Sequence, residues 1–251
     1  MNLTGNTILI TGGTSGIGLA LAEAFFQLGN KVIVAGRRQS LLDKIIAANP
    51  GMHGKQLDVQ DPIAIDDFCA NIEKEFPDLN ILINNAGISR QEDLAAEHID
   101  LSDARSIIQT NIVSTLHLTA ALLPILKRQP DATIITTTSG LAFVPRNNFP
   151  TYCASKAFLH SWLQSLRVQL RPTSVEVLEL IPPYVQTELS GPHQATDPRA
   201  MPLADYVAEV MQLLGDGSSP SGEILVERVK GERWAERNGD YEQRFIAFNG
   251  E

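Results

Sequence analysis

The sequence predicts an α/β protein, a doubly wound parallel sheet of about seven strands with helices on both faces. Short apolar or β-branched runs alternate with longer stretches of helical period along all 251 residues. The connection between two parallel strands must cross a face of the sheet, and a helix of this length usually forms that crossover. Runs such as residues 81–83 and 175–180 are apolar with little alternation, which is typical of strands covered on both sides.

The first three elements form a βαβ unit. Residues 7–11 are the first predicted strand, residues 17–28 the first helix and residues 31–35 the second strand. In this helix, apolar residues at helical spacing predict one buried stripe, made of Ile17, Leu21, Phe25 and Leu28. Later strands are expected at residues 54–59, 80–84, 132–138, 175–180 and 223–226, with helical patterns between them.

No linker divides the chain, so a single domain spanning residues 1–251 is expected. Hydrophobic residues make up 43% and charged residues 20%, the balance of a chain that buries a substantial core. Residues 182–202 interrupt the alternation and are rich in Pro, Gly, Thr and Gln. They follow the carboxyl end of a strand, where doubly wound folds bind ligands. Residues 183–202 are therefore expected to form a substrate lid.

Composition argues against several classes of protein. A formal net charge of -9 gives no basic field for a phosphate backbone, so nucleic acid is not an expected partner. Cys69 and Cys153 form no CxxC pair, and the five histidines lack a metal-ligand spacing, so neither a disulfide framework nor a metal is expected. No charged segment precedes an apolar run at the N-terminus, and no eighteen apolar residues follow one another. A cytoplasmic protein that does not enter a membrane is expected.

The turn between the first strand and the first helix is rich in glycine and has the pattern TGxxxGxG. Glycine lets the backbone approach a pyrophosphate, whose charge the free N–H groups of the helix N-terminus stabilise. The alternative is a tight turn that favours glycine for its conformation alone. The candidate nucleotide-binding residues of this turn are Gly12, Thr14, Ser15, Gly16, Ile17 and Gly18.

Further motifs follow in a fixed order along the predicted elements. They are Asp58 and Val59 at the end of the third strand, Asn84-Asn85-Ala86-Gly87 after the fourth, Asn111 in a helix, Ser139 after the fifth strand, and Tyr152 with Lys156 in the pattern YxxxK. Together with the glycine turn, these motifs resemble those of the short-chain dehydrogenase/reductase family over roughly residues 5–190. The resemblance implies a Rossmann-type fold in which these residues bind a nicotinamide dinucleotide or take part in catalysis.

The pair Tyr152 and Lys156 also makes chemical sense by itself. Residues four apart share one face of a helix, and an ammonium beside a phenol favours the phenolate. Since a free tyrosine titrates near pH 10, a neighbouring positive charge would make it a better base at neutral pH. Taken singly, a Tyr and a Lys at this spacing are surface neighbours and a Ser after a strand is a turn residue. The family resemblance implies the catalytic alternative.

In that family the tyrosine exchanges the proton of the substrate oxygen as hydride passes to or from the nicotinamide. The lysine also holds the nicotinamide ribose, the serine orients the substrate oxygen, and the asparagine keeps a water in the proton relay. The resemblance carries these roles to Tyr152, Lys156, Ser139 and Asn111 respectively. Pro182, Val185 and Thr187 are expected at the nicotinamide, with Thr187 matching the threonine that contacts its carboxamide.

The choice of cofactor depends on Arg37 and Arg38, which end the second strand where an acidic residue would accept hydrogen bonds from the ribose of NAD. The guanidinium fork suits a 2'-phosphate instead, so NADP(H) is expected and NAD(H) is the less favoured alternative. Both arginines could also simply point to solvent. One departure from the family is Pro183, which replaces a flexible glycine and stiffens the entrance to the lid. The stretch around it and residues 233–236 resemble the subgroup named after the dlt operon oxidoreductase.

The sequence thus predicts an enzyme that transfers hydride between NADP(H) and a carbonyl or secondary alcohol. A mostly apolar small-molecule substrate is expected, because four apolar or aromatic residues flank the expected site: Leu141, Phe143, Tyr184 and Leu189. An apolar band at residues 158–166 is either core or the interface of a homodimer or homotetramer, and the oligomer is the prediction. Two rival functions are a regulator that senses NADP(H) without turnover and a hydrolase using Ser139, which lacks a GxSxG elbow.

Overall fold

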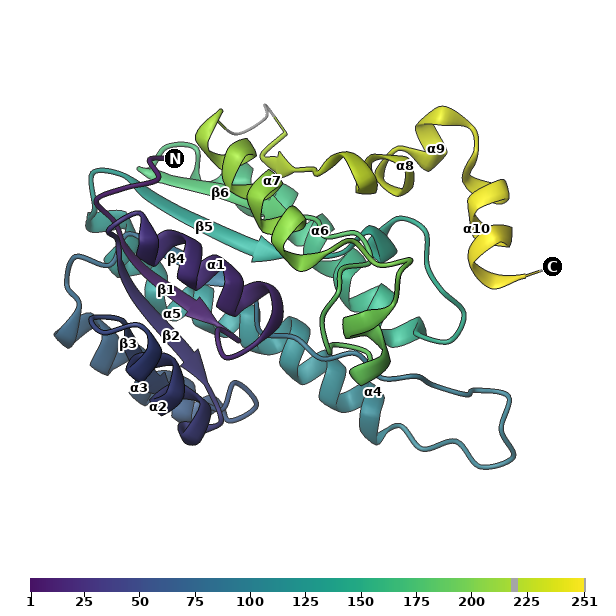
Figure 1. The fold of residues 1–251 in the computed structure, drawn as a ribbon, viewed down its shortest axis with the longest axis horizontal. Helices are drawn as coiled ribbons and strands as arrows, with labels where there is room; N and C mark the ends of the chain where they lie inside the picture. Colours follow the sequence, from purple (N-terminus) through teal and green to yellow (C-terminus); the bar gives the residue numbers. More distant parts are fainter. Residues whose placement is uncertain (218–220, 251) are drawn as a thin grey trace.

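The computed structural model describes residues 1–217 and 221–250, and these contain one seven-stranded sheet (Figure 1). All strand pairs are parallel, in the order β3-β2-β1-β4-β5-β6-β7. The predicted doubly wound fold is therefore confirmed. The strands are β1 (Thr7–Thr11), β2 (Lys31–Gly36), β3 (His53–Gln56), β4 (Ile81–Asn84), β5 (Ala132–Thr137), β6 (Val175–Leu180) and β7 (Glu223–Ile224).

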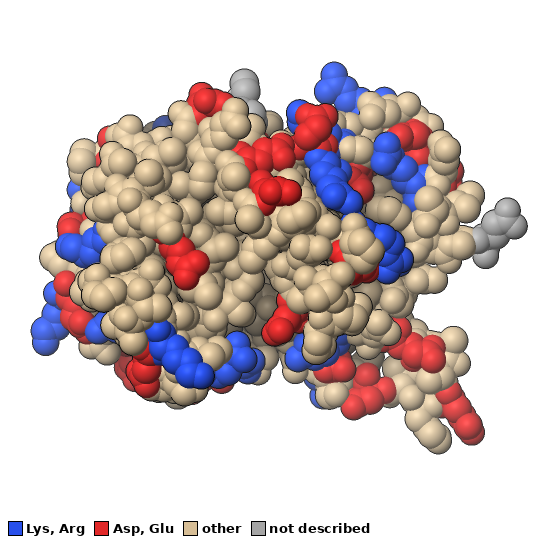
Figure 2. All heavy atoms as spheres, in the orientation of Figure 1, with Lys and Arg blue, Asp and Glu red and all other residues tan. Residues whose placement is uncertain are grey.

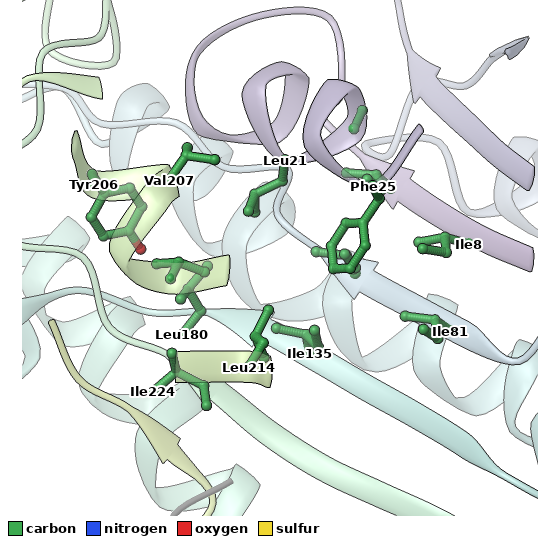
Figure 3. Packing of buried hydrophobic residues seen from close by; sticks show 14 of the residues in the cluster. Ile8, Leu21, Phe25, Ile81, Ile135, Leu180, Tyr206, Val207, Leu214 and Ile224 are labelled. Atoms are coloured by element: carbon green, nitrogen blue, oxygen red, sulfur yellow. The ribbon is translucent and has the colours of Figure 1, made fainter. Parts of the chain in front are cut away.

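Helices cover both faces of the sheet. One face packs against α1 (Gly16–Gln27), α2 (Gln39–Ala48) and α7 (Leu203–Gly215), and the other against α3 (Pro62–Glu75), α5 (Ser114–Arg128) and α6 (Pro150–Leu170). Alternate residues of each strand serve the two layers: in β1, Ile8 and Ile10 join the first layer and Leu9 the second. Figure 3 shows the first layer, where side chains of α1 and α7 meet those of the strands. Burial on both faces explains the apolar strands.

Several predicted boundaries and faces need correction. Ile17, predicted to be buried, is only partly buried. Leu28 is 43% exposed, because it is the C-cap of α1 and lies beyond its last turn. The third strand ends at Gln56, not at residue 59, since the chain turns through a bond from Asp61 N to Asp58 O. The last strand ends at Ile224.

The apolar band at residues 158–166 lies on α6. Most of it belongs to the core, which was one of the two alternatives, the other being an interface between subunits. Leu159, Leu163 and Leu166 are buried, and Trp162 is half-buried and packs against the second layer. Phe158 differs from them, with 43% of its surface exposed. A helix lying on a sheet must bury one face, and the band supplies that face.

A continuous helical run joins α4 (Ser102–Ile107), the π-helix η1 (Ile108–Val113) and α5. By length and hydropathy alone this run of 27 residues could cross a membrane. Its α5 part instead packs against α3, β4 and β5, and buries seven residues there, as a core helix of a sheet does. The π-helix, a form that often occurs at functional sites, contains Asn111.

Short elements complete the described chain: η2 (Gly140–Ala142), η3 (Pro192–Thr196), η4 (Glu227–Val229), α8 (Lys230–Arg233), α9 (Ala235–Asn238) and α10 (Tyr241–Asn249). The end of α10 is tied to the loop before α6, since Asn249 Nδ2 donates to Pro145 O at 3.0 Å. In Figure 1 these C-terminal helices and the segment before α4 extend beyond the carboxyl ends of the strands. This end of the sheet includes the switch point between β1 and β4, where doubly wound folds bind ligands.

Candidate active site

A cavity of about 700 Å³ lies at the carboxyl ends of the strands, a volume typical of small-molecule and cofactor sites. It brings together most of the residues singled out from the sequence, although they come from six different connections and from helix α6. Its lining includes Gly12, Thr14, Ser15, Gly16, Ile17, Arg37, Arg38, Asp58, Val59, Asn85, Ala86, Gly87, Ser139, Tyr152, Lys156, Pro182, Val185 and Thr187. The two other predicted residues, Gly18 and Asn111, are buried and do not line the cavity.

Two glycines of the turn, Gly12 and Gly18, have no space for a side chain. Gly12 has a φ of 65°, and a Cβ on it would lie 2.8 Å from Ala86 Cα. A Cβ on Gly18 would lie 2.5 Å from Gly12 O and 2.4 Å from the Asn85 amide. The backbone of the turn is thus packed directly against the segment after β4, and glycine is required by this close approach rather than by conformation alone.

The first turn of α1 offers N–H groups to the cavity. Ser15 is its N-cap, yet the Ser15 side chain makes no capping hydrogen bond, and no acidic residue lies in the first turn. Such a helix end attracts anions through its free N–H groups and its dipole. The glycine cradle and this helix end fit the pyrophosphate of a dinucleotide.

The segment after β4 is held in place by two residues. Thr11 Oγ1 accepts hydrogen bonds from Asn85 N at 3.1 Å and Ala86 N at 3.2 Å. Asn111 is fully buried; its Oδ1 accepts from Ile88 N at 2.9 Å and its Nδ2 donates to Ile88 O at 3.1 Å. In this structure Asn111 therefore fixes the loop backbone, a role that the sequence alone did not indicate.

Tyr152, Lys156 and Ser139 meet at one end of the cavity. Lys156 Nζ lies 5.8 Å from the centre of the Tyr152 ring and donates to Thr137 O at 2.8 Å. Burial raises the pKa of Tyr152 to about 12, and the Ser139 hydroxyl opposes this rise. Burial lowers the pKa of Lys156 to about 8. The expectation that Lys156 brings the phenol pKa below its usual value does not hold here, because desolvation penalises the charged form of each group.

A buried charge cluster lies behind Lys156 on the same side of α6. Glu179 is fully buried, accepts from Thr138 Oγ1 at 2.7 Å and lies 2.8 Å from His160 Nδ1. Arg233 makes a bidentate pair with the neighbouring Glu223, at 2.9 and 2.8 Å. The negative charge of Glu179 raises the pKa of Lys156 and so partly offsets its desolvation. Although the sequence gave no metal-ligand spacing, His160, Glu179 and Glu223 have ligand atoms within 4.8 Å of one another, but Thr138 and Arg233 already bind the carboxylates.

The opposite end of the cavity is formed by the loops after β2 and β3. Arg37 and Arg38 are exposed and line it, together with Asp58. Gln56 Nε2 donates to Arg37 O at 3.0 Å and thereby joins the two loops. Among the described residues neither arginine forms an ion pair with a carboxylate.

Most of the apolar residues expected around the substrate lie outside the cavity lining. Of the four flanking residues, only Leu189 lines the cavity; Leu141, Phe143 and Tyr184 do not. Tyr184 instead donates its hydroxyl to Asp197 at 3.2 Å. Sequence reasoning missed several polar lining residues, namely Gln60, Arg90, Thr110, Gln186, Glu188 and Gln194. For Arg90 a signal existed, because it follows Asn85-Ala86-Gly87 by three positions.

A glycine-cradled anion site joined to a buried tyrosine and lysine defines the class of a nucleotide-dependent oxidoreductase. The family model for short chain dehydrogenases matches residues 6–198, and the chain belongs to this family. It is 42% identical to the "Uncharacterized oxidoreductase DltE" of Bacillus subtilis, over 99% of this chain and 98% of that one. It is 34% identical to the serine 3-dehydrogenase of Agrobacterium fabrum, over 76% and 78%. It is 32% identical to sulfoacetaldehyde reductase 2 of Chromohalobacter salexigens, over 73% and 74%.

Solved structures agree with the fold. A short chain dehydrogenase from Burkholderia cenocepacia in complex with NADP has a TM-score of 0.81 and 25% identity, over 98% of both chains. A short chain dehydrogenase/reductase from Burkholderia phymatum in complex with NAD has a TM-score of 0.81 and 22% identity, over 97% of this chain and 96% of that chain. These two relatives hold a nicotinamide dinucleotide, NADP in the first and NAD in the second.

Proposed function

We propose that this protein is an NADP(H)-dependent oxidoreductase that interconverts a carbonyl compound and a secondary alcohol, with Tyr152 as the general acid and base. One observation carries the proposal: the glycine cradle lines the same cavity as Tyr152, Lys156 and Ser139. The bound nicotinamide would supply or accept the hydride. The carbonyl carbon would then receive the hydride from the nicotinamide, and the carbonyl oxygen the proton from Tyr152.

The roles of the side chains follow from their positions. In reduction, Tyr152 donates its phenolic proton to the carbonyl oxygen, and its raised pKa keeps it protonated at neutral pH. Ser139 Oγ, which accepts from Leu141 N at 3.1 Å, keeps its own proton to hold the same oxygen. Lys156 provides positive charge beside the phenol and would hold the nicotinamide ribose of a bound nucleotide. Asn111 holds the loop that carries Ile88, and we assign it the relay role of its family.

The cofactor preference is expected to depend on Arg37. Titration of the wild type should give NADPH an affinity greater than that of NADH by about 1–3 kcal/mol, roughly 5- to 150-fold, as a charge-assisted hydrogen bond would. Arg37→Ala should lose most of this preference, whereas Arg171→Ala, at an exposed position outside the cavity, should keep it. Equal affinities in the wild type would contradict the assignment, as would an Arg37→Ala protein that still prefers NADPH.

We further propose that residues 183–202 act as the substrate lid of a single catalytic unit spanning residues 1–251. Val185 pairs with Met201, and Gln194 Nε2 donates to Val185 O at 2.7 Å, so the segment has internal bonds that let it move as one piece. Pro183 lies at its start and lines the cavity.

A cytosolic location is also proposed, because it suits the free, buried thiols of Cys69 and Cys153.

A homodimer or homotetramer is proposed from the apolar residues that the helices η1 and α6 leave exposed. Ile108, Val113, Phe158 and Val168 are 44%, 40%, 43% and 55% exposed. Light scattering at micromolar protein should show a particle of at least twice 27.4 kDa. Phe158→Glu should dissociate it, because a charge would be buried unpaired, whereas Ile246→Glu, exposed on α10, should not. A wild type that scatters as a monomer would contradict this proposal.

Two rival functions are less well supported. A sensing regulator would not need Tyr152 and Lys156 in the cavity, and the relatives named above that carry an activity are enzymes. A hydrolase would need a base to take the proton of Ser139, and the titratable group beside that hydroxyl is Tyr152, whose raised pKa keeps it protonated at neutral pH.

A screen of aldehydes, ketones and alcohols that follows the absorbance of the reduced nicotinamide tests the proposal directly. The panel should include hydroxy and oxo acids, because serine and sulfoacetaldehyde, the compounds in the names of two relatives, both carry an acidic group near the reacting carbon. Turnover of no member with either nucleotide would contradict the proposed function.

A further inference from the structure

Arg90 is a basic residue of the cavity lining that neither the cofactor assignment nor the proposed chemistry uses. It belongs to the segment between β4 and α4, which contacts the first turn of α6 through Glu92. Arg37, Arg38 and Asp58 belong instead to the loops after β2 and β3. Arg90 therefore lies on the Tyr152 side of the cavity, away from the end assigned to the adenosine phosphate.

The backbone on both sides of Arg90 is fixed. Two residues before it, both backbone polar groups of Ile88 are bonded to the Asn111 side chain. Two residues after it, Glu92 N donates to Asn148 O at 3.1 Å. The Glu92 carboxylate accepts from Thr151 N at 2.9 Å and from Thr151 Oγ1 at 2.7 Å, which caps the first turn of α6.

This anchoring ties the position of Arg90 to that of the general acid. Thr151 directly precedes Tyr152 in α6, so Glu92 clamps the Arg90 segment to the turn that carries the phenol. Residues held on rigid elements in this way can recognise a ligand at a fixed distance from the reacting atoms.

The guanidinium of Arg90 has unused capacity. Its one hydrogen bond to another described residue is from Nη1 to Ser89 O, at 2.9 Å. Arginines elsewhere in the described chain, such as Arg233 and Arg244, bind carboxylates of their own. Glu92, the acidic group two residues away, already accepts two hydrogen bonds from Thr151. An exposed guanidinium presents a planar fork of donors that matches a carboxylate or a sulfonate.

We infer that Arg90 binds an anionic group of the substrate, so that the protein acts on small oxo acids and hydroxy acids, with a carboxylate or sulfonate close to the reacting carbon. The inference rests on the proposed function and replaces the apolar substrate expected from the sequence. Lys156 and Tyr152 act at the carbonyl, while Arg90 fixes the other end of the molecule. The acid group would be held by charge-assisted, bidentate hydrogen bonds.

The test compares an acid with its neutral ester. With saturating NADPH, the wild type should reduce 3-oxobutanoate with a kcat/KM at least tenfold above that for methyl 3-oxobutanoate. Arg90→Met should lower kcat/KM for the acid about 10- to 100-fold, mainly through KM, which is the scale of a hydrogen bond to a charged group. The ester and the NADPH affinity should change little. Arg90→Lys should retain part of the preference, and Arg105→Met, outside the cavity, should resemble wild type.

Two results would overturn the inference. One is a wild type that reduces the ester as well as the acid. The other is an Arg90→Met protein whose kcat/KM falls equally for the acid and the ester. That result would indicate that Arg90 pairs with the exposed Glu188 across the cavity. Calorimetric titration of 3-oxobutanoate and 3-hydroxybutanoate into the protein saturated with NADP⁺ gives a readout without turnover. Binding that Arg90→Met abolishes would support the inference even if the proposed reaction failed, and a lack of any acid binding would contradict it.

Discussion

Tyr152→Phe is expected to lower kcat for carbonyl reduction about 100- to 10,000-fold, the usual scale of general acid–base catalysis. The phenol lies at the catalytic end of the cavity, and burial keeps its pKa near 12. Only the hydroxyl is lost in the variant, so the ring still fills its place and NADPH should bind almost as in the wild type. Steady-state kinetics and nucleotide titration measure the two quantities.

Tyr241→Phe is the matched control. Tyr241 stacks on Phe245 in α10 and lies outside the cavity, so its turnover should equal that of the wild type. If Tyr152→Phe kept near-wild-type turnover on a carbonyl that the wild type reduces, the tyrosine mechanism would be wrong for this chain.

Lys156→Met is expected to lose turnover and part of the NADPH affinity, and yet to make the protein more stable. Burial lowers the pKa of Lys156 from 10.5 to about 8, so below pH 8 the folded protein holds a buried ammonium at a cost of about 3 kcal/mol. Methionine removes that cost. It also removes the hydrogen bond to Thr137 O, and this loss lowers the free energy of unfolding by about 1–2 kcal/mol. The free energy of unfolding at pH 7 should therefore rise by about 1–2 kcal/mol.

The stability difference between Lys156→Met and the wild type should become smaller as the pH rises. Between pH 8 and pH 10.5 the unfolded wild type still holds the Lys156 proton, but the folded protein has released it, so wild-type stability should rise with pH relative to the variant. Urea denaturation at pH 7 and pH 10 measures this, with Lys127→Met, exposed on α5, as the control. A Lys156→Met protein less stable than the wild type at pH 7 would show that the buried charge is compensated in the folded state.

Local sequence was enough to predict the fold and the parts of the site that follow strands. The glycine turn, the segment after β4 and the pair on α6 all come directly after or within predicted elements, and parallel strands bring their carboxyl ends to one edge. The face shown in Figure 2 has acidic side chains interspersed with basic ones, and the chain as a whole carries a net charge of -9.

Contacts between distant residues decided the rest. Burial of Tyr152 and Lys156 by the surrounding loops reversed the expected influence on the phenol pKa. The apolar band on α6 could be divided between core and surface only once the sheet beneath it was in place. Arg90 became a candidate ligand for the substrate only through the anchors at Asn111 and Thr151, which lie 21 and 61 positions further along the chain. Spacing along a chain determines which residues share an element, whereas desolvation and long-range hydrogen bonds depend on which elements meet.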